Sequence, residues 1–151
     1  MSNQNENRAT PKFAPNSIGW SKALTHVILI AVPAICVIMG LLFMTGFFRE
    51  EKVESTIKAL DVFYGLGLLG IAALGLFTRS AVFWDKKTAP KNSTIFFALL
   101  AATTAVHSVL LGAITGKMFY YAITIISAFG VGALTAFNYL YFKKRKHIYK
   151  Y

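Results

Sequence analysis

The feature that most constrains this chain is a series of four long apolar blocks separated by short polar segments. The 151 residues are 56% hydrophobic and only 15% charged, whereas soluble domains average about 25% charged residues. A helix needs about 20 apolar residues to cross a hydrocarbon core about 30 Å thick. We therefore predict an all-α integral membrane bundle of four transmembrane helices in up-down-up-down order. No segment outside the blocks is long enough to bury a separate core.

The four spans are predicted at residues 22–48, 56–82, 94–115 and 118–142, within a transmembrane domain that covers 22–142. Residues 1–21 are polar and form a predicted flexible cytoplasmic arm, and residues 143–151 form a basic cytoplasmic tail. Pro33 predicts a kink in the first span, and Pro90 is expected to keep the preceding loop from joining the third. The short turn at Gly116 and Lys117 predicts an antiparallel hairpin.

The basic residues predict the orientation. Twelve of the 16 lysine and arginine residues fall on the side that carries both termini, so the positive-inside rule places both termini in the cytoplasm. We expect a multi-pass cell-membrane protein of a bacterial inner membrane. The short basic runs beside the spans are expected to bind anionic lipid headgroups and not nucleic acid. The headgroup candidates are Lys86, Lys87, Lys143, Lys144, Arg145 and Lys146.

Small residues recur every four positions in the last two predicted helices. Such spacing lets membrane helices approach closely and gain dispersion contacts. The predicted packing residues are Gly112 and Gly116 in the third span and Ala128, Gly132 and Ala136 in the fourth. The spacing alone leaves open whether the partner helix belongs to the same chain or to another.

His107 is the ionisable residue predicted to lie deepest, near the middle of the third span. A buried imidazole is expected to be neutral at pH 7 and to face protein, with a hydroxyl or carbonyl as partner. Thr103, Thr104 and Ser108 surround it in sequence. Asp61, near the outer end of the second span, is expected to pair with the nearby Lys58 or to be solvated, with lining of an outer vestibule as the alternative.

The sequence contains no recognisable catalytic or metal-binding set, and we predict no cofactor. Its only cysteine, Cys36, cannot form an internal disulfide or a thiolate cage. His26 and His147 are predicted at depths different from that of His107, which argues against haem held by two histidines of one chain.

The end of the fourth span, Asn138-Tyr-Leu-Tyr-Phe-Lys-Lys-Arg-Lys146, resembles that of some uncharacterised four-helix membrane proteins of Gram-positive bacteria, and the stretch from Asp61 to Arg79 is loosely similar too. The resemblance implies a bacterial membrane location and no activity. We expect a non-enzymatic protein that self-associates or serves as an accessory subunit of a membrane complex. The alternatives are a small oligomeric transporter or channel that uses His107, and a subunit that contacts quinone or haem.

Overall fold

The computed structural model describes residues 19, 23–48, 54–84 and 87–144. Within these residues, four helical segments are long and apolar enough to cross a membrane, at Leu24–Met44, Ser55–Phe83, Ala89–Thr115 and Met118–Lys143. The first combines a π-helical turn, η2 (Leu24–Ile28), with α2 (Leu29–Met44), and the others are α3 (Ser55–Phe83), α4 (Ala89–Thr115) and α5 (Met118–Lys143). The prediction of four apolar helices is confirmed.

Pro33 does not break the first helix. It lies inside α2, and the five-residue π turn ends just before the proline-containing helix begins. Proline has no N–H and its ring crowds the carbonyl four residues earlier, which here belongs to Leu29. A π turn at this point is one way in which a helix absorbs such a disturbance.

The start of α4 differs from the prediction. The helix begins at Ala89, five residues before the expected start at residue 94, and Pro90 lies in its first turn. Proline is accepted there because the first backbone N–H groups of a helix have no partner within it. The Ser93 hydroxyl donates to the Ala89 carbonyl oxygen at 2.7 Å, within the first turns of the helix.

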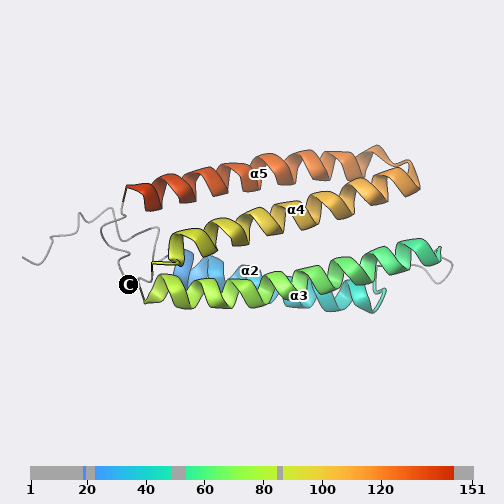
Figure 1. Ribbon diagram of the computed structural model, residues 1–151. Coiled ribbons are helices and arrows are strands. Elements are labelled where there is room, and N and C mark those ends of the chain that lie inside the picture. The colour runs from blue at the N-terminus through green and yellow to red at the C-terminus, as the bar shows by residue number, and fades with distance from the viewer. Residues whose placement is uncertain (1–18, 20–22, 49–53, 85–86, 145–151) are drawn as a thin grey trace, which may run out of the picture.

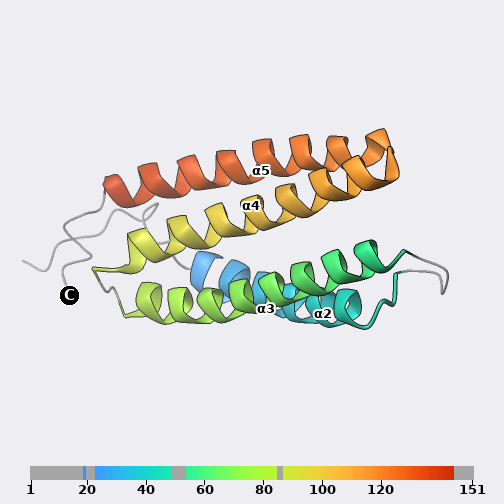
Figure 2. The ribbon, with the colours of Figure 1, turned by 45° about the vertical axis from the view of Figure 1, so that its right-hand side comes forward.

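Successive helices run in opposite directions, as the colour gradient shows in Figures 1 and 2. Helix α2 packs on α3, α3 on α4, and α4 on α5. In both views α5 lies on the side of α4 away from α2 and α3. The helices therefore pack in series, and α5 is supported chiefly by α4.

Gly40 and Gly65 bring the backbones of α2 and α3 close together. A Cβ atom on Gly65 would lie 2.6 Å from the Gly40 carbonyl oxygen, and one on Gly40 would lie 2.9 Å from the Gly65 carbonyl oxygen. Gly75 of α3 faces two helices at once, because a Cβ there would meet Pro33 of α2 at 2.5 Å and Phe96 of α4 at 2.9 Å. Glycine thus sets the interhelical spacing through backbone proximity.

The predicted packing residues of the last two helices have different roles. Gly112 is a close contact, since a Cβ there would lie 2.9 Å from the Tyr121 ring of α5. Gly116 is not a packing residue: its φ of 68° makes it the left-handed cap that ends α4. Ala128, Gly132 and Ala136 line an open groove between α4 and α5, and nothing lies within 4 Å of a Cβ at Gly132. Gly132 thus makes no close helix contact within the chain, and a contact with a helix of another chain stays a prediction.

Candidate functional site

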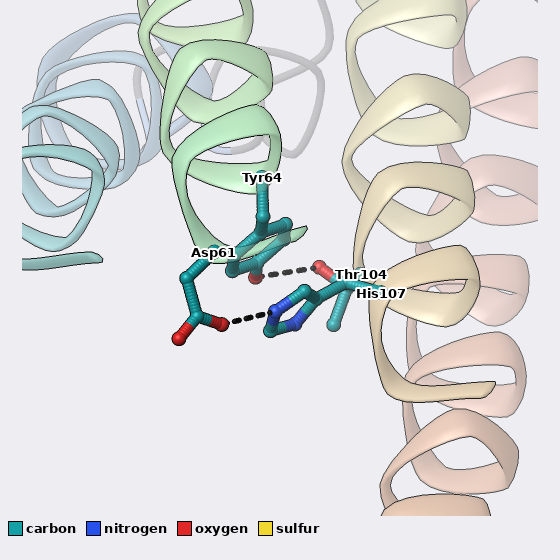
Figure 3. A network of polar contacts seen from close by, with 4 residues as sticks. All are labelled: Asp61, Tyr64, Thr104 and His107. Carbon is teal, nitrogen blue, oxygen red and sulfur yellow. Dashed lines mark hydrogen bonds and ion pairs between the residues drawn. The ribbon is translucent and has the colours of Figure 1, made fainter. Parts of the chain in front are cut away.

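The candidate site is a buried acid–histidine pair between α3 and α4. His107 Nε2 lies 2.9 Å from Asp61 Oδ1, and Figure 3 shows the two side chains meeting between their helices. The two residues retain only 6% and 2% of their exposure. His107 faces protein and has a polar partner, as predicted, but that partner is a carboxylate and not a hydroxyl or carbonyl group.

Aromatic rings enclose the histidine. The Tyr64 ring stacks on the imidazole with centroids 3.9 Å apart and an angle of 5° between the planes. Phe43 of α2 meets the imidazole edge-on at 5.4 Å and the Tyr64 ring edge-on at 4.9 Å. Stacked and edge-on aromatic pairs each contribute about 0.5–1.5 kcal/mol beyond the area they bury. The pair and the two aromatic rings around it therefore connect three helices, with α2 contributing the Phe43 ring.

A second polar contact runs beside the pair. The Tyr64 hydroxyl lies 3.4 Å from Thr104 Oγ1, again between α3 and α4. At this distance it is a weak hydrogen bond. It connects the ring that stacks on His107 to α4 at a second point.

The chemistry of the pair depends on which of its atoms carry protons. A hydrogen bond between Nε2 and a carboxyl oxygen needs a proton on one of the two atoms. With Asp61 ionised, the imidazole Nε2–H donates to Oδ1, and a second proton on Nδ1 would make the contact an ion pair. Removing one partner of a buried ion pair typically costs about 3–5 kcal/mol.

The location of the pair corrects one expectation. Asp61 is 2% exposed, so the prediction of a solvated carboxylate is wrong. His107 is eight residues from the end of α4 at Thr115 and five residues from Ala102, the central residue of the helix. It therefore lies nearer to the middle of α4 than to the end where α4 turns into α5.

The remaining predicted polar residues lie close to the pair but do different things. Thr103 packs through its methyl group on α3, since a Cβ at Gly67 would lie 3.1 Å from Thr103 Cγ2. Ser108 is buried beside His107 at 4% exposure.

Of the predicted headgroup residues, Lys87, Lys143 and Lys144 are exposed at the opposite end of the bundle. The other three, Lys86, Arg145 and Lys146, lie outside the described residues.

Sequence reasoning missed the roles of Phe43 and Tyr64, which were not among the candidate residues. A signal for the position of Asp61 was present. Asp61, Leu68, Gly75 and Val82 are seven residues apart, and all four lie on the buried face of α3. Seven residues are close to two helical turns, so an acidic residue in register with this face is directed into the bundle.

Buried polar contacts also join the helices at the other end of the bundle. Asn138 Nδ2 of α5 donates to Ser93 Oγ of α4 at 3.1 Å, and both residues are fully buried. Arg79 Nε of α3 donates to the Thr25 carbonyl oxygen in the π turn at 3.1 Å. Each successive pair of helices is thus linked by at least one polar contact.

The described residues contain no group of three or more His, Cys, Asp or Glu side chains that could hold a metal ion. An iron atom seeking His107 Nε2 would have to compete with the Asp61 carboxylate.

Comparisons of the chain with protein-family models, curated proteins and solved structures found no match. The resemblance to Gram-positive membrane proteins therefore stays an expectation from the sequence.

Proposed function

We propose that this chain is a non-enzymatic multi-pass membrane protein that acts by helix association. We propose further copies of the same chain as its partner, bound through α5. The carrying observation is the one-sided packing of α5. The apolar 18-residue windows of the first three helical segments are 22–33% buried, whereas that of α5 is 0% buried. Helix α5 is thus the segment with the most surface left for a partner helix.

The outward face of α5 carries large side chains at helical spacing. Ile126, Phe129 and Phe137 are 71%, 76% and 52% exposed. Three- and four-residue steps bring them close to one face, and none of the three lines the groove that α5 forms with α4. Apolar side chains also face lipid in any bundle, so α5 is singled out by its low burial among the described helices and not by hydropathy.

In this proposal the Asp61–His107 pair holds two helical hairpins together. Helices α2 and α3 form one hairpin and α4 and α5 the other, and the pair joins them across the α3–α4 contact. A buried polar pair can fix the register of helices, because misaligned packing would leave both groups unsatisfied. The Asp61–His107 pair would thereby hold α5 at a fixed angle for association.

The proposed orientation places both termini in the cytoplasm, supported by the charge bias along the sequence. Fusing a reporter that is active only outside the cytoplasm after Tyr151 should give no signal, while the same reporter inserted in the 49–53 segment should be active. The opposite result would reverse the orientation.

The association is tested by the mass of the purified protein in mild detergent. We expect a protein mass of two or more chains of 16.7 kDa each. We expect Phe129→Ala to shift this mass towards that of a single chain. Phe77→Ala on α3 is the control, since Phe77 is similarly exposed at 72%. A mass of one chain at all accessible concentrations would contradict self-association, and other chains co-purifying in fixed ratio would instead favour an accessory subunit.

The buried pair favours a second candidate function, proton-coupled transport by an oligomer. Ionisable side chains within membrane helices often mark proton or ion pathways, and Asp61 and His107 can exchange a proton over 2.9 Å. Purified protein in liposomes should then show flux that responds to a pH gradient. Asp61→Asn should abolish the flux while folded protein remains, and no flux in wild-type liposomes would reject this candidate.

A further inference from the structure

The face shared by α4 and α5 carries a groove with two chemically distinct parts. At the end of the bundle where α5 terminates, a cavity of about 470 Å³ is lined by Lys87, Lys91 and Lys143, with Tyr139 and Thr94 beside them. A second hollow of about 640 Å³ continues between the two helices and shares Thr94 and Tyr139 with the first. Its lining is almost wholly small and apolar, with Ala98, Ala101, Ala105, Ala128, Gly132 and Ala136 along its length.

We propose that this groove binds one anionic phospholipid, with the headgroup on the three lysines and an acyl chain along the small-residue trough. The proposal requires membrane insertion but not self-association through α5, whose outward face is separate from the groove. The lysine cavity also lies at the first turns of α4, where Pro90, Lys91 and Thr94 line it. The positive end of that helix dipole adds to the attraction for an anion.

The length of the trough supports a lipid as the occupant. From Thr94 to Ala105 the trough follows eleven residues of α4, or about 16 Å at 1.5 Å per residue. This is close to the depth of one leaflet, half of a hydrocarbon core about 30 Å thick. A lipid of the leaflet beside the lysines would therefore have its headgroup and its chain at matching depths.

Charge argues against a second copy of this chain in the groove. The two acidic residues that the described part of the chain contains, Glu54 and Asp61, lie at the start of α3, away from the lysines at the start of α4 and the end of α5. A second copy in the same orientation would bring its own lysines beside Lys87, Lys91 and Lys143. An anionic headgroup instead neutralises them, and each basic residue near an anionic surface contributes favourably.

The proposal is tested by native mass spectrometry of the full chain in detergent, titrated with phosphatidylglycerol or with phosphatidylcholine of the same acyl chains. We expect one phosphatidylglycerol to bind preferentially. Lys91→Gln and Lys143→Gln should each weaken this binding about fivefold. Lys117→Gln, which removes a lysine at the other end of the same hairpin, should have little effect.

Substitutions at two glycines of α5 distinguish filling of the trough from a general effect of a larger side chain on this helix. Gly132→Leu fills the trough, whereas Gly130→Leu adds the same side chain outside it, and a Cβ at either position would have no atom within 4 Å. We expect phosphatidylglycerol binding to fall in the first variant and to persist in the second. Glycerol phosphate, which lacks an acyl chain, should not compete.

Several results would overturn the proposal. They are equal affinity for the two lipids, equal loss in Gly130→Leu and Gly132→Leu, and full competition by glycerol phosphate. A change of oligomeric mass in Gly132→Leu without a change in lipid binding would also overturn it, because it would assign the groove to a second copy.

Discussion

Replacing Gly65 with alanine is the most direct perturbation of the packing between α2 and α3. The new methyl group would lie 2.6 Å from the Gly40 carbonyl oxygen and 2.6 Å from Met44 Cγ. The methionine side chain can move aside, but the carbonyl belongs to the backbone of α2. The two helices must therefore separate or shift, and overpacking of this kind typically costs about 1–3 kcal/mol.

Gly70 is the matched control on the same helix. It is exposed, and a Cβ there meets no atom within 4 Å. The gain in helix propensity from glycine to alanine, about 1 kcal/mol in water, is common to both substitutions and cancels in the comparison. Gly65→Ala should therefore be less stable than Gly70→Ala by about 1–3 kcal/mol, or roughly 2–12 °C in Tm for a chain of this size.

The single cysteine supplies the assay. Cys36 lies on the buried face of α2 with 4% of its surface exposed, so a maleimide dye that fluoresces on reaction reports unfolding at one defined position. Thermal ramps in detergent should give a lower midpoint for Gly65→Ala than for Gly70→Ala, and Gly40→Ala should resemble the former. Equal midpoints for Gly65→Ala and Gly70→Ala would refute the close backbone contact.

Three further outcomes follow from the same contacts. Asp61→Leu and His107→Leu should each destabilise the fold by about 3–5 kcal/mol, while the double variant should lose clearly less than the sum; additive losses in detergent unfolding would contradict a buried pair. Tyr64→Phe keeps the stacked ring and should cost less than about 1.5 kcal/mol, whereas Tyr64→Leu should cost more in the same assay, and equal losses would exclude a role for the stack. Gly112→Leu should lower the thermal midpoint because Tyr121 lies at the site, whereas Gly132→Leu should leave it nearly unchanged, and the reverse order would contradict the groove.

The number and positions of the helices follow from the sequence because the lengths of apolar runs are set by the thickness of a bilayer. Three of the four C-terminal ends lie within one residue of the predicted ones, at Phe83, Thr115 and Lys143. The start of α4 differs because a proline in the first turn is compatible with a helix, so Pro90 does not mark the boundary that the sequence predicts.

The site was predicted only in part. His107 was singled out because a lone ionisable residue deep in an apolar run needs a polar partner. Its partner, Asp61, is 46 residues away, and the rotation of α3 relative to α4 decides whether the two meet. That rotation depends on close contacts such as Gly75 against Phe96, which residue spacing within one helix does not reveal.

Cross-linking between copies in the native membrane tests self-association through α5 most directly. With Cys36 replaced by serine, Phe129→Cys places one thiol on the outward face of α5, and Phe77→Cys places one on α3; the native side chains are 76% and 72% exposed. Oxidation should yield a disulfide-linked dimer from Phe129→Cys and little or none from Phe77→Cys. Equal dimer yields from both variants, or no dimer from Phe129→Cys, would contradict association through α5.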